Sequence, residues 1–177
     1  MIRYTLRTYA ADAARVFSTG SSAGCAMTQV MAAAYPDLIA AATCYSGAAA
    51  GCLAGSPGFS PQTMDPACAR GQNVKTGAEW AAVARAMHPG WDGPYPRMAT
   101  WHGTADAVAS YINLAEQVKQ WSALLGVEFA RNVTDSPARG YTQMVFGDGT
   151  RLTAYSAEGV GHTVPVHALE DMEWFGL

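Results

Sequence analysis

The segment Ser18-Thr19-Gly20-Ser21-Ser22-Ala23-Gly24 contains the pattern Gly-x-Ser-x-Gly, with Ser22 as the central serine. Residues 15–19 before it are typical of a short buried strand, and residues 23–35 after it have the apolar spacing of a helix that ends before Pro36. A serine between strand and helix matches a nucleophile elbow, the strained turn that lifts a hydroxyl clear of a sheet. Strand and helix then approach closely, which favours glycine at 20 and 24. The alternative is a turn that only caps the helix.

The rest of the chain alternates strand and helix patterns. Further strands are predicted at 40–45, 97–102, 141–146 and 151–156, the last two as a hairpin. Further helices are predicted from the capping box that starts at Thr76 and over residues 111–125. The predicted buried helix faces are Met27, Val30, Met31 and Ala34; Trp80, Val83, Ala84 and Met87; and Leu114, Val118, Trp121 and Leu125. We therefore expect an α/β fold with a mostly parallel sheet, in one domain over 1–177, with 51–77 as a long loop.

Composition and charge narrow the class of protein. The 177 residues are 50% hydrophobic and 14% charged, enough apolar material for one domain core. No apolar run approaches the roughly 20 residues that a membrane-spanning helix needs. The net charge is −3 and the eleven basic residues are scattered along the chain. This pattern excludes a basic surface for nucleic acid and a basic helix that lies on a membrane. A small neutral or mixed-charge substrate is the expected partner, and the chain is expected to be a monomer.

A nucleophilic serine needs a base and an orienting carboxylate, which follow it in the order serine, acid, histidine in α/β-hydrolases. Asp106 comes just after the strand predicted at 97–102, and His162 just after the strand predicted at 151–156. Since reactive residues gather at the carboxyl ends of parallel strands, we expect Ser22, Asp106 and His162 to meet. The Ala23 backbone N–H is the predicted oxyanion donor. The alternative for Asp106 is the N-cap of the next helix.

The other histidines have structural interpretations. His88 follows a helix end, where a cation suits the helix dipole. His102 ends a strand and is expected to be a buried, hydrogen-bonded support near the site. His167 is interpreted as a surface residue, since it does not have the i, i+4 spacing of helical metal ligands from His162. Asp92, Asp148 and Asp135 fit turns and loops. No metal ion or organic cofactor is required by this chemistry.

The four cysteines are Cys25, Cys44, Cys52 and Cys68. Their spacing does not suggest a zinc site. They permit two disulfides in three pairings, or buried free thiols. Asn132-Val133-Thr134 is a glycosylation sequon, which is informative in a secreted protein. No signal peptide is visible at Met1.

Three segments together resemble a known family. Residues 16–38 read Val-Phe-Ser-Thr-Gly-Ser-Ser-Ala-Gly-Cys-Ala-Met-Thr-Gln-Val-Met-Ala-Ala-Ala-Tyr-Pro-Asp-Leu and resemble the nucleophile region of the fungal acetylxylan esterases of carbohydrate esterase family 1. These are akin to type-B feruloyl esterases and polyhydroxybutyrate-depolymerase-like esterases. His-Gly-Thr-Ala-Asp at 102–106 and Gly-Val-Gly-His-Thr-Val-Pro-Val-His at 159–167 resemble the acid and histidine regions, and 171–177 resembles the family's ending.

The resemblance implies an α/β-hydrolase fold and a secreted, often glycosylated serine esterase that removes acyl groups from plant cell-wall xylan. Its triad falls on Ser22, Asp106 and His162. The family has several strands and a second oxyanion donor before the position of Met1, so the chain is expected to be the C-terminal portion of such an esterase. A Cys44–Cys52 disulfide is expected to tie a strand end to the following loop.

Two alternatives to deacetylation of xylan stay open. One is a feruloyl esterase of the same family, because acetyl and feruloyl esters need pockets of different depth. The other is an inactive fold that at most binds polysaccharide, with Trp91, Tyr95 and Trp101 as candidates for stacking on sugar rings. For Trp101, core packing is the favoured interpretation.

Overall fold

The structure, a computed structural model, describes residues 1–58 and 60–177. In this part of the chain the strands form one six-stranded sheet of order β1-β2-β3-β6-β5-β4. The four neighbouring strands β1, β2, β3 and β6 are parallel to one another, whereas β5 pairs antiparallel with both β6 and β4. The strands are β1 (Phe17–Ser21), β2 (Ala41–Tyr45), β3 (Arg97–Gly103), β4 (Phe129–Thr134), β5 (Tyr141–Phe146) and β6 (Leu152–Ala157). The predicted α/β class is confirmed.

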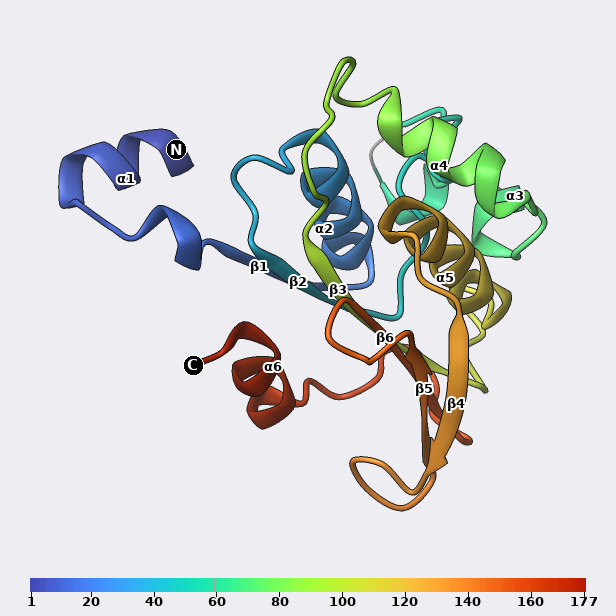
Figure 1. Cartoon of the computed structure of the whole chain (residues 1–177). Helices are drawn as coiled ribbons and strands as arrows, with labels where there is room; N and C mark the ends of the chain where they lie inside the picture. The colour runs from blue at the N-terminus through green and yellow to red at the C-terminus, as the bar shows by residue number, and fades with distance from the viewer. Residues whose placement is uncertain (59) are drawn as a thin grey trace.

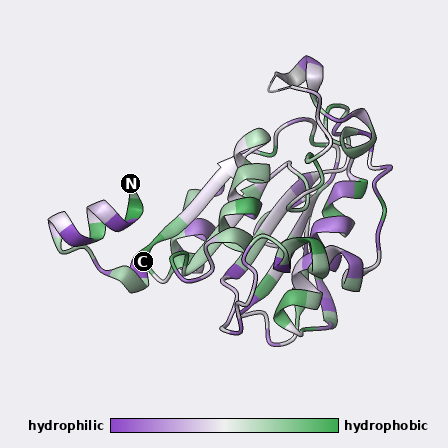
Figure 2. Cartoon of the chain, turned by 90° about the horizontal axis from the view of Figure 1, so that it is seen from above, coloured by the Kyte–Doolittle hydropathy of each residue, from purple (hydrophilic) through white to green (hydrophobic). Residues whose placement is uncertain are grey.

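Helices cover the sheet on both faces (Figure 1). On one face lie α2 (Ala23–Ala34), α4 (Gly77–Arg85) and α5 (Ile112–Leu125), and on the other lies α6 (Ala168–Phe175). The short elements are η1 (Ala13–Arg15), η2 (Pro61–Thr63) and α3 (Pro66–Ala69). Helix α1 (Ile2–Tyr9) buries none of its residues and projects from the layered body in Figures 1 and 2, with Arg3 paired to Asp37 at 2.7 Å. None of the helices that the structure describes is long and apolar enough to cross a membrane.

The capping box predicted at Thr76 is present. The Thr76 side chain accepts from the Glu79 N–H, and the Glu79 carboxylate accepts from the Thr76 N–H, so α4 begins at Gly77. Strand β4 and helix α6 were not predicted. All of β4 except Val133 is exposed, since it forms the sheet edge, and such a strand lacks the alternation that marks a half-buried one.

The predicted buried face of α2 is wrong. Met27 is 59% exposed, and the buried residues of α2 are Cys25, Thr28, Gln29, Ala32 and Ala33. Small side chains let this helix lie close to the sheet. Gln29 is buried because its amide accepts from the Trp121 indole N–H and donates to Gln117, both on α5. Internal hydrogen bonds of this kind remove the penalty for burying an amide.

The cysteines form two disulfides, Cys25–Cys44 and Cys52–Cys68. The expected Cys44–Cys52 pairing is therefore wrong, and so is the free-thiol alternative. The reason is the position of α2 on the sheet: the Cα atoms of Cys25 and Cys44 are 4.7 Å apart across the helix–strand contact. Cys52 instead faces α3, which lies inside the segment 51–77 that was predicted as loop.

Candidate active site

Ser22 occupies the turn between β1 and α2. Its backbone has φ 56° and ψ −118°, in the region that residues other than glycine rarely adopt. The Ser22 N–H donates to the Tyr45 carbonyl oxygen at 2.8 Å, which fastens the turn to the end of β2. The expectation that both glycines are needed here is right for Gly20 and wrong for Gly24. A Cβ on Gly20 would overlap the Gly24 backbone, whereas a Cβ on Gly24 would have no heavy atom within 4 Å.

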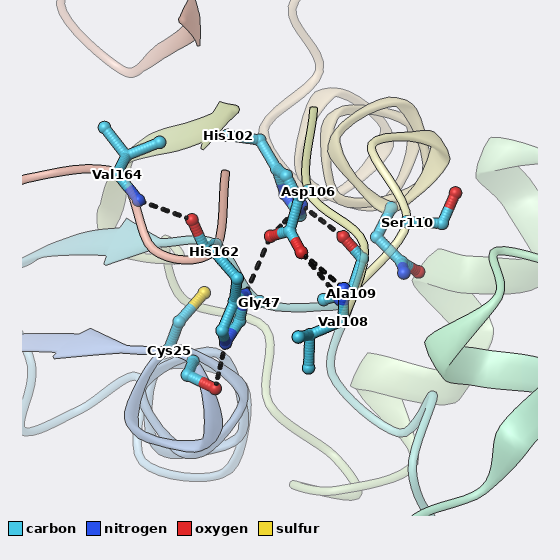
Figure 3. A network of polar contacts seen from close by, with 12 residues as sticks. Cys25, Gly47, His102, Asp106, Val108, Ala109, Ser110, His162 and Val164 are labelled. Atoms are coloured by element: carbon cyan, nitrogen blue, oxygen red, sulfur yellow. Dashed lines mark hydrogen bonds and ion pairs between the residues drawn. The ribbon is translucent and has the colours of Figure 1, made fainter. Parts of the chain in front are cut away.

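His162 lies between the serine and the aspartate. Its Nε2 is 2.8 Å from the Ser22 Oγ, and its Nδ1 is 2.8 Å from an Asp106 carboxylate oxygen. Figure 3 shows His162 and Asp106 joined in this way. A carboxylate only accepts, so the neutral ring carries its proton on Nδ1 and leaves Nε2 to accept from the serine hydroxyl. The structure thus brings all three predicted residues into one hydrogen-bonded chain.

The Asp106 carboxylate is held from several sides. It is buried, and its Oδ1 accepts from the N–H groups of Val108 and Ala109, each at 2.9 Å (Figure 3). Burial raises the pKa of Asp106, but the hydrogen bonds from His162 and from these two N–H groups outweigh it and lower the pKa below its ordinary value. Asp106 therefore caps its own turn. It is not the N-cap of α5, where Tyr111 stands.

His102 lies behind Asp106, as expected of a buried support. Its side chain is fully buried, and its Nε2–H donates to the Ala109 carbonyl oxygen at 2.8 Å. The same nitrogen is 3.3 Å from the Asp106 Oδ2. Burial lowers the pKa of His102, against the opposite influence of Ala109 and Asp106, so this ring is neutral at neutral pH.

The predicted oxyanion donor stands at the start of a helix. Ala23 is the first residue of α2 and is exposed, and the N–H of a first helical residue has no acceptor within its own helix. The positive end of the helix dipole lies at the same place. An anion that forms beside the Ser22 Oγ therefore meets a free donor and a favourable field.

The interpretation of His167 needs correction. His167 is not a surface residue: its ring stacks on Trp101 with centroids 4.5 Å apart, and its backbone N–H donates to the Tyr45 hydroxyl. Trp101 is 1% exposed, which confirms core packing as the favoured interpretation of this residue and rules out stacking on a sugar. His88 is structural as predicted, with its Nδ1 3.0 Å from the Ala34 carbonyl oxygen. Asn132 lies exposed on the edge strand β4.

No cluster of three or more His, Cys, Asp or Glu side chains that fits a metal ion occurs within residues 1–58 and 60–177. The ionisable groups at the site are Ser22, His162, Asp106 and the supporting His102. Chemically, this arrangement can activate a serine hydroxyl as a nucleophile and return its proton to a leaving group.

The chain is similar to known esterases. Feruloyl esterase B of Talaromyces funiculosus is 45% identical over 177 residues, which is all of this chain and 50% of that protein. Acetylxylan esterase A of Aspergillus awamori is 41% identical over 180 residues, covering 58% of that protein. The solved acetyl xylan esterase from Aspergillus awamori superposes with a TM-score of 0.91 and 40% identity, over 99% of this chain and 64% of that one.

No family model matches the sequence. The chain spans about half to three fifths of the length of the curated relatives it matches. The match nevertheless runs through the whole of this chain, in sequence and in fold. The expected resemblance to the fungal acetylxylan esterases and the feruloyl esterases is confirmed.

Proposed function

We propose that this chain carries the nucleophile, base and acid of a serine carboxylic ester hydrolase. The observation that supports this most directly is the chain of two 2.8 Å hydrogen bonds from Ser22 through His162 to Asp106. Ser22 follows β1, Asp106 follows β3 and His162 follows β6, so all three stand past the carboxyl ends of parallel strands.

In the first half of the proposed reaction, each group has a role that its position supports. The Ser22 Oγ attacks the ester carbonyl carbon while its proton passes to the His162 Nε2. The charge that develops on the carbonyl oxygen is stabilised by the Ala23 N–H. Asp106 accepts from the His162 Nδ1–H and stabilises the imidazolium that forms. When the tetrahedral intermediate collapses, the carbon–oxygen bond to the alcohol breaks, and His162 gives that oxygen its proton.

The second half reverses these roles with water. His162 takes a proton from a water molecule, whose oxygen attacks the acyl-serine carbonyl carbon. Collapse of this second intermediate releases the carboxylic acid and returns the proton to the Ser22 Oγ. Every proton transfer uses the same His162 nitrogen, so no metal ion or organic cofactor is part of the proposed mechanism.

The proposed substrate is acetylated xylan, and the leaving group is a hydroxyl of a xylose unit. The names of the relatives support this class: one set is named acetylxylan esterase and another feruloyl esterase B. The feruloyl ester is the second candidate, because the relatives with 45% identity carry that name. The two candidates share one mechanism and differ in the acyl group.

The two disulfides support a place in an oxidising compartment, and we propose that the protein is secreted. The exposed Asn132 sequon is the proposed site of an N-linked glycan. A mass shift on treatment with an N-glycosidase, lost in Asn132→Gln, tests this site.

The central test compares the unmutated chain with Ser22→Ala and with Ser21→Ala, the neighbouring serine, as a matched control. A fluorophosphonate probe should label the unmutated chain and Ser21→Ala but not Ser22→Ala. Release of acetate from acetylated xylan and of ferulate from methyl ferulate then ranks the two substrate candidates. Equal labelling or hydrolysis by Ser22→Ala would overturn the proposal.

A further inference from the structure

The residues Tyr45 and Ser46, at the carboxyl end of β2, contact both halves of the candidate site. The Tyr45 carbonyl oxygen accepts from the Ser22 N–H at 2.8 Å. The Ser46 Oγ accepts from the Val164 N–H at 2.9 Å, two residues beyond His162. One dipeptide therefore fastens the turn that carries the serine and the loop that carries the histidine.

The loop at 158–167 has no helix or strand of its own, so its hydrogen bonds decide where His162 lies. On the near side, the Val160 carbonyl oxygen accepts from the Ala105 N–H at 3.0 Å, next to Asp106. On the far side, the Val164 N–H donates to Ser46, and the Val164 side chain is fully buried. His162 thus stands midway between two anchors, one on the aspartate turn and one on β2.

Ser46 is an unusual residue for its position. It is fully buried and has φ 52°, in the left-handed region where glycine is the usual residue. Its own N–H donates to the Trp101 carbonyl oxygen, so the backbone there is fixed by β3 as well. Glycine would meet the backbone requirement without strain. What serine adds is a hydroxyl, and that hydroxyl reaches the histidine loop.

We propose that Ser46 is a positioning residue: its hydroxyl holds the far side of the His162 loop and thereby keeps the His162 Nε2 within hydrogen-bonding distance of the Ser22 Oγ. The inference deepens the proposed function and rests on it. Without the hydroxyl, the loop loses its backbone anchor nearest to His162 on the far side, and the next one there is the bond from the His167 backbone N–H to the Tyr45 hydroxyl. A displacement of about 1 Å between reacting groups is enough to lower a rate by about 10²-fold, so loss of this anchor should slow the attack of Ser22.

The test uses two variants that separate the hydroxyl from the backbone strain. Ser46→Ala removes the hydroxyl and keeps a Cβ at positive φ, whereas Ser46→Gly removes the hydroxyl and relieves the strain. Ser18→Ala is the matched control, because the Ser18 hydroxyl shares a hydrogen bond with Thr28 and does not contact the loop. Two quantities are measured: the rate of fluorophosphonate labelling at Ser22 per folded molecule, and the hydrogen exchange of the Val164 amide.

Both Ser46 variants should label at least about tenfold more slowly per folded molecule. Their Val164 amide should exchange about fivefold faster or more, as expected for the loss of one hydrogen bond. Ser18→Ala should change neither quantity. Labelling of Ser46→Gly at the unmutated rate would overturn the proposal, since the backbone alone would then suffice. An unchanged Val164 amide in Ser46→Ala would overturn it as well.

The amide measurement also separates this inference from the proposed function. If the unmutated chain is not labelled but the Val164 amide responds to Ser46→Ala and Ser46→Gly, the anchoring is supported and the proposed function is overturned. If the unmutated chain is labelled and both Ser46 variants match it, the proposed function stands and the positioning role is overturned.

Discussion

Gly20 lies so close to the start of α2 that a Cβ on it would overlap the Gly24 carbonyl group and stand 2.9 Å from the Cys25 nitrogen. The Gly24 side of this contact is different, because a Cβ on Gly24 would project into open space. The two glycines of the Gly-x-Ser-x-Gly pattern therefore have different reasons to be present. Gly20 lets β1 and α2 meet at Ser22, and Gly24 is not required by packing.

The substitutions Gly20→Ala and Gly24→Ala should have different effects on the free energy of unfolding. Gly20→Ala should lower the free energy of unfolding by about 1–3 kcal/mol or more, because backbone atoms must move to admit the methyl group. Gly24→Ala should leave it unchanged or raise it by up to about 1 kcal/mol, because alanine has the higher helix propensity. Urea denaturation of both variants measures the difference. Equal destabilisation would contradict the asymmetry.

Substitution of Asp106 should strongly lower the rate of ester hydrolysis, although this carboxylate reaches Ser22 only through His162. In Asp106→Asn the amide group can donate to the His162 Nδ1, which favours the tautomer that carries its proton on Nε2 and cannot accept from Ser22. The expected loss in kcat is about 10⁴-fold, the magnitude that this kind of change has in serine hydrolases.

Hydrolysis of a nitrophenyl acetate at pH 7 measures the effect of Asp106→Asn. Asp148→Asn is the matched control, because Asp148 accepts from Thr150 in an exposed turn. It should retain the unmutated rate. A loss of less than tenfold in Asp106→Asn would contradict the proposed role of this carboxylate.

Glu116 should make the stability of the fold depend on pH. Its buried carboxylate accepts from the Lys119 ammonium group, the Trp80 indole N–H and the Lys75 backbone N–H. Burial raises the pKa of Glu116, but these hydrogen bonds outweigh it and lower the pKa below its ordinary value. A depressed folded-state pKa means that the stabilisation is present above the pKa of the unfolded chain and is lost as pH falls through the folded value.

Unfolding free energies at pH 6 and at pH 3.5 should therefore differ more for the unmutated chain than for Glu116→Gln. At pH 6 the variant should be less stable, because a neutral amide replaces a charged acceptor that holds three donors. Glu128→Gln serves as a comparison, because Glu128 is exposed. An equal pH dependence in Glu116→Gln and the unmutated chain would contradict this role.

The sequence predicts most of the sheet, the candidate site and the buried faces of α4 and α5, but it does not predict the buried face of α2. Ser22, Asp106 and His162 follow strands, and the order of strands in a parallel sheet brings such positions together, so their meeting could be anticipated. The buried face of α2 could not, because Gln29 is buried through partners on α5 that are far away in sequence. Periodicity ranks Met27 above Gln29 for burial, and tertiary hydrogen bonds reverse that order.

The role of Ser46 and the disulfide pairing depend on tertiary distances in the same way. Nothing near Ser46 in the sequence indicates that its hydroxyl meets Val164, which is 118 residues away. From the sequence, His167 is interpreted as a surface residue because its spacing from His162 does not fit a pair of helical metal ligands, yet its ring stacks on Trp101. Local patterns specify which elements form, whereas these contacts follow from where the elements pack.

The disulfide between Cys52 and Cys68 should contribute to the stability of the fold. This bridge joins two cysteines 16 positions apart, and the residues that the structure describes between them include η2 and the start of α3 but no strand, so they have little sheet pairing to hold them. Loss of a cross-link of this length should lower the free energy of unfolding by about 3 kcal/mol. The double variant Cys52→Ala/Cys68→Ala, compared with the unmutated oxidised chain by urea denaturation, measures this loss. Peptide mapping without reductant is the control, and a peptide linking Cys44 to Cys52 would contradict the pairing on which the prediction rests.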